Sequence, residues 1–334
     1  MMTHFLCGAL LSIGLATGAE NLPTKPLRCE LVSLPGAEIS FLIDGVERLT
    51  WHGGSDVPRP FFFPLIGPSG EPLTRMGHPG APDHDHHRSI WFAHHDIEGH
   101  SFWTEETEAR IRQKQWLAME SGEEEARLGT LLGWYDPEGI ELLEQELVVA
   151  VRPLSEGEMT VELQSTWRLP EGRESTRLEK TNFGLLAVRM AASISARFGA
   201  GRLLDSEGRE GEKAIFGQQA VWMDYSGPVA VGQGEERHWV EEGVAFLDHP
   251  QNPRYPTHWH VRDDGWMGAS YCFADGETIT PEKPLVLRYL LYVHNGRDAS
   301  AAITKENEAF AARPGFIVAP GSASHVKFEI SRAK

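Results

Sequence analysis

The sequence predicts an all-β protein with a large antiparallel sheet system, and three observations support this. Asp44-Gly45 separates the strand-like runs AEISFLI and VERLTW, and Asp-Gly supplies the positive φ angles of a type I′ hairpin turn. Between residues 110 and 169, four long strand-like runs follow one another, separated by turns rich in Gly, Pro and Glu. Only one short helix is expected, from about Ala299 to Ala312, where Asp298 can serve as N-cap and Pro314-Gly315 ends the run.

The other elements continue the β pattern. Residues 140–151 could form a helix, since three leucines lie near helical spacing, but the Val-rich end favours a strand. Further strand-like runs are found at 183–198, 220–226, 243–249, 256–261 and 285–293, and two more end the chain. Because the sequence has no repeat of fixed period and no convincing linker, we expect residues 20–334 to form a single domain.

The first nineteen residues are typical of a signal peptide. Residues 5–15 form an apolar run too short to span a bilayer, and ATGA at 16–19 offers the small residues that a signal peptidase reads. Cleavage after Ala19 would give a periplasmic or secreted bacterial protein without membrane insertion. Only Cys29 and Cys272 would then remain; one disulfide between them could form in an oxidising compartment.

Composition and missing motifs exclude several functional classes. The net charge of −17 argues against binding to nucleic acid or anionic membranes, because an acidic surface repels phosphate. The chain also lacks a G-x-S-x-G elbow, a P-loop, a G-x-G-x-x-G fingerprint and an H-E-x-x-H helix motif. Serine hydrolases, nucleotide-binding enzymes and common zinc proteases are therefore disfavoured.

Two histidine-rich clusters stand out. Residues 83–105 contain six of the fifteen histidines, and residues 248–266 form the second cluster. Histidine titrates near neutral pH, so such clusters can transfer protons, bind a metal or hydrogen-bond a ligand. We expect the fold to bring the two clusters into one site. Isolated histidines such as His78 and His238 are expected to be ordinary structural residues, and His95 and His100 are intermediate between the two cases.

Strand alternation gives the expected geometry within each cluster. If residues 83–94 enter a strand, His84 and His86 share one face and His87 lies on the other. In the second cluster, His258 and His260 would point the same way. An H-x-H pair on a strand can supply two imidazoles to a metal, or place an acid and a base beside one substrate.

These considerations give a set of candidate residues. His87 and His260 are the expected acid and base, and Glu105, the nearest carboxylate to the first cluster, would orient or replace one of them. The full set of catalytic candidates is His87, His94, Glu105, His258 and His260. Tryptophans that could stack on a sugar ring, and polar side chains that could bind hydroxyls or a carboxylate, make up the substrate-binding candidates: His84, His86, Arg88, Trp91, Trp103, Arg189, Asp224, His249, Asn252, Arg254, Trp259 and Arg262.

Five blocks resemble a known bacterial family. RPFFFPLIGPSGEPLTR, DHDHHRSIWFAHHDIEGHSFW, FGLLAVRM, VWMDYSG and FLDHPQNPRYPTHWHVRDDG resemble the family labelled PmoA-like. The label names a methane oxygenase, an integral membrane enzyme, whereas this chain has no apolar segment able to span. The resemblance therefore implies an uncharacterised secreted protein with a β-supersandwich similar to galactose mutarotase. Asp85 and His95 depart from the family pattern, which usually has proline and glycine there.

We therefore expect a secreted carbohydrate-active enzyme, an epimerase, lyase or hydrolase, that uses His and Glu acid–base chemistry on a small sugar or an oligosaccharide. No cofactor is expected. One alternative is a metal-dependent enzyme in which His84, His86, His258 and His260 hold zinc, copper or iron. The other is a sugar-binding protein without catalytic activity.

Overall fold

The computed structural model describes residues 25–78 and 84–333. The predicted signal peptide, residues 1–19, and the first residue of the first cluster, Asp83, lie outside the described residues. In the part of the chain that is described, no helix is long and apolar enough to cross a membrane.

Two antiparallel sheets of eight strands each dominate the fold. The first sheet has, in spatial order, β1 (Cys29–Leu34), β2 (Glu38–Ile43), β3 (Val46–His52), β4 (Phe61–Leu65), β5 (Ile90–His94), β11 (Gly184–Arg189), β16 (Trp266–Ser270) and β15 (His258–Arg262). The second has β12 (Arg202–Asp205), β13 (Trp222–Val231), β14 (His238–Asp248), β18 (Leu285–Asn295), β9 (Met159–Arg168), β8 (Glu141–Pro153), β7 (Ala126–Tyr135) and β6 (Arg110–Glu120).

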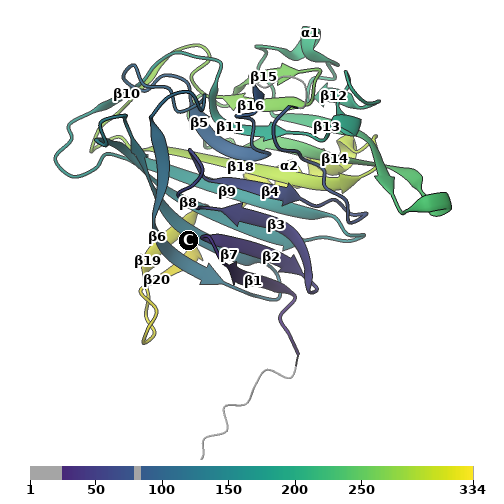
Figure 1. The fold of residues 1–334 in the computed structure, drawn as a ribbon, viewed down its shortest axis with the longest axis horizontal. Coiled ribbons are helices and arrows are strands. Elements are labelled where there is room, and N and C mark those ends of the chain that lie inside the picture. The colour runs from purple at the N-terminus through teal and green to yellow at the C-terminus, as the bar shows by residue number, and fades with distance from the viewer. Residues whose placement is uncertain (1–24, 79–83, 334) are drawn as a thin grey trace, which may run out of the picture.

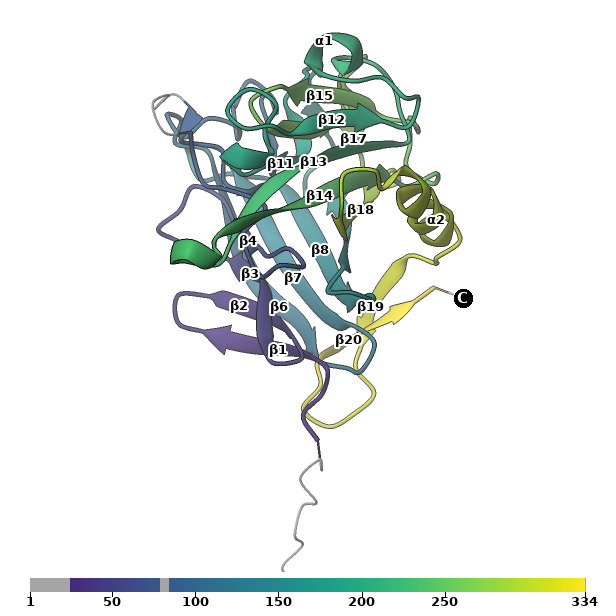
Figure 2. The same ribbon diagram turned by 90° about the vertical axis from the view of Figure 1, so that its right-hand side faces the viewer.

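Smaller elements complete the fold. They are the strand pairs β10 (Thr176–Leu178) with β17 (Glu277–Ile279) and β19 (Phe316–Pro320) with β20 (Phe328–Arg332), the helices α1 (Glu212–Ile215) and α2 (Ser300–Ala311), and the 3-10 turns η2 (Ala192–Ile194) and η3 (Gly234–Glu236). In Figure 1, β5, β11, β16 and β15 lie at the end of the molecule opposite the β1–β2 hairpin, and Figure 2 shows β11 and β15 at that same end. This end carries the candidate site.

The hydrophobic core lies between the two large sheets. Leu186 and Val188 of β11 join one buried cluster with Leu163 of β9 and Phe246 of β14. Alternate residues of a strand point to opposite faces, so Ala187 and Arg189 face away from this core. The predicted all-β antiparallel supersandwich with a short helix near the C-terminus is confirmed.

Local predictions were mostly confirmed. Asp44 and Gly45 have φ angles of 51° and 78°, as the type I′ turn between β2 and β3 requires. Residues 141–153 form strand β8 rather than a helix. The C-terminal helix begins at Ser300, and its N-cap is Ala299, without a side-chain capping bond. The predicted cap Asp298 instead contacts Arg202 at 3.4 Å.

One expectation about the first cluster is corrected, and the pairing of the two cysteines, which the sequence left open, is answered. Strand β5 begins only at Ile90, and the backbone N–H of His87 donates to the carbonyl of His84 in a tight turn. Strand alternation therefore does not apply to residues 84–87. Cys29 and Cys272 are both buried free thiols, so the disulfide that was considered is not formed.

Candidate functional site

The floor of the site is the face of the first sheet that points away from the core. Cross-strand pairing places Trp91, Ala187, Gly268 and His260 in one row across β5, β11, β16 and β15. The two central residues are small, so they leave room for the Trp266 ring, which packs in one buried cluster with Trp91 and Ala187. A Cβ on Gly268 would lie only 3.2 Å from Cζ2 of Trp266.

A pocket of about 330 Å³ opens above this floor. The neighbouring row supplies Arg189, Trp266 and Arg262, and the turn before β5 supplies three histidines of the first cluster. The complete lining is His84, His86, His87, His95, Trp103, Thr104, Phe183, Arg189, His260, Arg262, Asp264 and Trp266. The two clusters thus lie together, as expected.

Six aromatic side chains of the pocket lining form one connected set of ring contacts, and Trp103 also contacts Trp266 at a centroid distance of 5.2 Å. Each contacts the next, with centroid distances of 4.5, 4.8, 5.7, 4.8, 5.2 and 6.4 Å in the order His86, His87, Trp266, His260, Phe183, Trp103 and back to His86. Such contacts between rings fix their orientation. The wall of the pocket is therefore held in place by its own members.

His87 is buried between two tryptophans. Its ring stacks on Trp91 and Trp266 at centroid distances of 5.5 and 4.8 Å. Among the described residues, its Nδ1 atom has no hydrogen-bond partner. Burial, followed by the charge of Arg189, lowers the pKa of His87 far below its usual range. The imidazole is neutral at physiological pH.

His260 has a defined tautomer. Its Nδ1 lies 3.0 Å from the carbonyl oxygen of Asn182, and a carbonyl only accepts, so Nδ1 carries the proton. The lone pair is then on Nε2. Burial, followed by the charge of Arg262, lowers the pKa of His260 to about 4. His260 is therefore a neutral proton acceptor near pH 7.

The carboxylate of the pocket is Asp264. Its two oxygens accept hydrogen bonds from the fully buried guanidinium of Arg189 at 2.7 and 3.2 Å. Burial raises the pKa of Asp264, but the bonds to Arg189 outweigh this and hold it below its usual value. His78, expected to be an isolated structural residue, lies 3.8 Å from the same carboxylate. Asp264 follows β15 in the turn Asp263-Asp264-Gly265, inside the second cluster.

Glu105, the carboxylate proposed from the sequence, is not part of the pocket lining. Arg88 donates two hydrogen bonds to it, at 2.5 and 2.7 Å, and Arg59 lies at 3.5 Å. Burial raises the pKa of Glu105, but these arginines lower it by a larger amount. Glu105 and Arg88 therefore form a salt bridge outside the pocket lining.

Other candidates near the clusters also lie outside the lining. His94 is fully buried, and its Nδ1 accepts from the backbone N–H of Asp96. His258 lies two residues before His260 on β15, and its ring stacks on Phe273 at a centroid distance of 5.0 Å. Trp259, on the opposite face as predicted, packs in the core and donates to the carbonyl of Ala220. Trp91 lies beneath His87.

The remaining substrate-binding candidates belong to structural networks. Asp224 accepts from His294 at 2.9 Å between β13 and β18. His249 contacts the buried Arg288 at 2.8 Å. Asn252 and Arg254 bond mainly to backbone: Asn252 to Arg288, and Arg254 to the carbonyls of Tyr271, Asp275 and Gly276. These polar groups of the second cluster shape its turn rather than the pocket.

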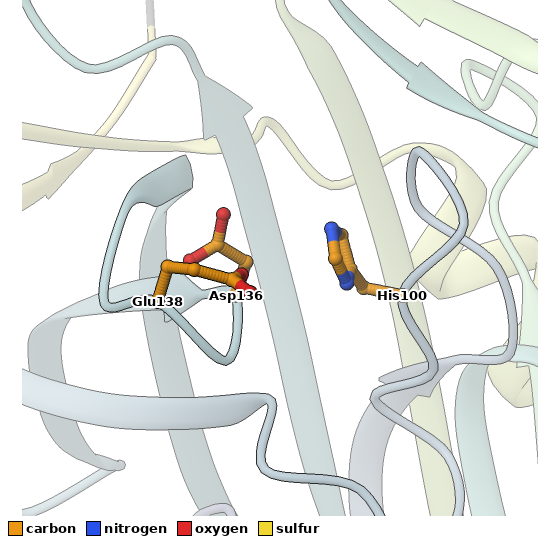
Figure 3. Close-up of side chains that lie close together, drawn as sticks. All are labelled: His100, Asp136 and Glu138. Carbon is orange, nitrogen blue, oxygen red and sulfur yellow. The ribbon is translucent and has the colours of Figure 1, made fainter.

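Three of the four histidines considered for a metal lie at one pocket, and the metal alternative stays a prediction. His84, His86 and His260 line the pocket, but His258 is outside it. Among the described residues, three potential ligand atoms come within 4.8 Å of one another at a different place, formed by His100, Asp136 and Glu138 (Figure 3).

Sequence comparison gives a family. The DUF6807 family, described as a family of unknown function, matches residues 38–308. The chain belongs to this family. The narrower PmoA-like label stays a prediction. No functionally curated protein matches the chain.

Two solved structures are distantly similar to this family member. A polysaccharide lyase aligns with 89% of the chain at 11% identity and a TM-score of 0.32, and the chain covers 36% of that lyase, about a third of its length. A GalM/aldose epimerase homologue from C. elegans aligns with 80% of the chain at 6% identity and a TM-score of 0.31, and 98% of that protein is covered.

Proposed function

We propose that this protein is a carbohydrate-active enzyme that removes a proton from a sugar bound in the pocket. The observation that carries the proposal is the convergence of neutral imidazoles, one carboxylate and several aromatic side chains in the lining of a single cavity. Aromatic faces stack on the C–H face of a sugar ring. The imidazoles, Thr104 and Arg262 provide partners for its hydroxyl groups.

His260 is the proposed base. Its Nε2 lone pair is available because Nδ1–H is committed to the Asn182 carbonyl. On taking a proton from the substrate it becomes an imidazolium, and the negative charge of Asp264, which raises the pKa of His260, stabilises that form. Because both pKa values are lowered, neither His260 nor His87 is an imidazolium, the acid form of histidine, at the start of a reaction near pH 7. Epimerisation or elimination, which begin with proton removal, are therefore favoured over hydrolysis, which begins with proton donation to the leaving oxygen.

The test is turnover on a panel of neutral and acidic mono- and oligosaccharides. His260→Gln should lower kcat by about 10²- to 10⁴-fold, the usual contribution of a positioned base. His87→Ala removes the ring that packs between Trp91 and Trp266 at the pocket wall and should also lower kcat. His238→Gln, an exposed histidine on the β13–β14 hairpin, is the matched control and should leave turnover unchanged.

Full turnover in both pocket variants would refute the proposed roles. Saturable glycan binding without any product from the wild-type protein, measured as a ligand-dependent rise in melting temperature, would instead identify a sugar-binding protein.

A further inference from the structure

A second candidate site lies outside the pocket, where two turns meet. His100 belongs to the loop between β5 and β6, and Asp136 and Glu138 belong to the turn between β7 and β8. One ligand atom from each of the three lies within 4.8 Å of the others. Figure 3 shows the imidazole of His100 facing the turn that carries the two carboxylates.

The carboxylate of Asp136 is buried without a compensating cation among the described residues. The residue is buried, with 7% of its surface exposed, and its Oδ1 accepts one hydrogen bond, from the backbone N–H of Ile140. Within residues 25–78 and 84–333, no lysine, arginine or histidine forms an ion pair with it; Arg110, whose strand neighbour is Tyr135, pairs with Glu108. A buried carboxylate is costly unless a cation compensates it.

The three side chains lie close together without bonding to one another. All three are described, yet no hydrogen bond and no ion pair within 4.0 Å joins the imidazole to either carboxylate, although the ligand atoms lie within 4.8 Å. Ligands of one tetrahedral zinc ion, at about 2.0–2.2 Å from the metal, are about 3.4 Å from one another. Small side-chain rotations would bring the three atoms to this spacing, and a cation would fill the gap between them.

The backbones of both turns are already ordered. Ile97 and His100 exchange two backbone hydrogen bonds of 3.0 Å across Glu98 and Gly99, which have φ angles of 53° and 87°. In the other turn, the backbone N–H of Asp136 donates one hydrogen bond of 3.0 Å to the carbonyl of Ile140. Only side-chain freedom must therefore be lost on metal binding, which favours affinity.

We propose that His100, Asp136 and Glu138 bind one divalent transition-metal ion of the zinc class, which cross-links the β5–β6 loop to the β7–β8 turn. One imidazole and two carboxylates are ligands that zinc accepts, whereas calcium requires oxygen ligands alone. The ion has a structural role, because this loop also carries Trp103 of the aromatic pocket lining three residues later. The site is separate from the pocket and does not depend on the proposed function.

Isothermal titration with Zn²⁺ tests the site on the full chain, purified without a histidine tag and treated with EDTA. The wild-type protein should bind one equivalent and melt at a higher temperature. His100→Gln and Asp136→Asn should each weaken binding by more than about tenfold and abolish the Zn²⁺-dependent rise in melting temperature. Ca²⁺ should bind far more weakly.

Control variants distinguish zinc binding at this site from zinc binding by other histidines and from loss of the fold. His238→Gln and Asp44→Asn, an exposed histidine and a turn aspartate elsewhere, should bind like the wild type. His100→Gln changes a partly exposed side chain, so it tests the site even where Asp136→Asn fails to fold. Wild-type protein without one-equivalent binding, unchanged affinity in His100→Gln, or loss of the equivalent in His84→Gln would each overturn the proposal.

Discussion

Replacing Asp264 with asparagine should destabilise the protein by about 3 kcal/mol at neutral pH. The change removes the charge that compensates Arg189, whose side chain is 0% exposed and whose Nε has no partner among the described residues. Removing one partner of a buried ion pair costs about 3–5 kcal/mol. We expect a cost at the lower end of this range, because the Asp264 side chain is 20% exposed and asparagine keeps one oxygen that can accept a hydrogen bond from Arg189.

Urea unfolding at several pH values measures this cost and its cause. Arg189 lowers the pKa of Asp264 below 3.8, its value in an unfolded chain. Its stabilising charge is therefore fully present above pH 3.8 and is lost as the pH falls through the folded-state pKa. The difference in free energy of unfolding between the wild type and Asp264→Asn should stay constant from about pH 8 to pH 5 and become smaller below about pH 4.

A neighbouring aspartate supplies the control. Asp263 accepts a backbone hydrogen bond from Glu212 at 2.9 Å, so Asp263→Asn should cost about 1 kcal/mol, the value of an ordinary hydrogen bond. A cost below about 1 kcal/mol for Asp264→Asn, or a difference that does not change on acidification, would refute the charge-based account of this pair.

Three further predictions concern packing, thiols and the second sheet. Gly268→Ala should displace the Trp266 ring, cost about 1 kcal/mol in urea unfolding and weaken glycan binding; unchanged tryptophan fluorescence and affinity would contradict it. Burial raises the pKa of Cys29 to about 11 and of Cys272 to about 12, so a thiol reagent should label neither at pH 8 until urea unfolds the chain. Glu162→Gln should cost about 3–5 kcal/mol, because three arginines within 3.0 Å lose their buried partner; an unaltered urea midpoint would exclude this.

Local rules predicted what depends on local chemistry. The Asp44-Gly45 turn, strand β8 and the position of Trp259 opposite His260 all follow from turn propensity or from alternation within one strand. The meeting of the two histidine clusters was also expected, because dense imidazole in two separated segments is hard to explain by packing alone.

The choice of carboxylate could not be predicted in this way. Glu105 is closer in sequence to the first cluster, but which acid faces the pocket depends on where each arginine lies in three dimensions. Arg88 binds Glu105 outside the pocket, and Arg189 holds Asp264 at its edge. The turn Asp263-Asp264-Gly265, directly after the His258–Arg262 strand, was the available signal, since a turn at the end of a strand that lines a site points its side chains toward it.

The predicted division of the histidines at residues 84–87 between two strand faces was wrong for a related reason. Alternation assigns faces only inside a strand, and β5 begins three residues after His87. All three histidines of this turn line the pocket together, which no strand could achieve.

The pocket is thus built from two halves with different tolerance to change. His260, Arg262 and Trp266 stand on strands whose opposite face belongs to the hydrophobic core, so substitutions that shift these strands also disturb the core. In the turn of residues 84–87 only His87 is constrained in this way, because it is buried between Trp91 and Trp266; loops otherwise accept changes of sequence and length more readily than strands. Directed evolution of ligand preference should therefore randomise residues 84–86 and keep His87 and the strand half constant.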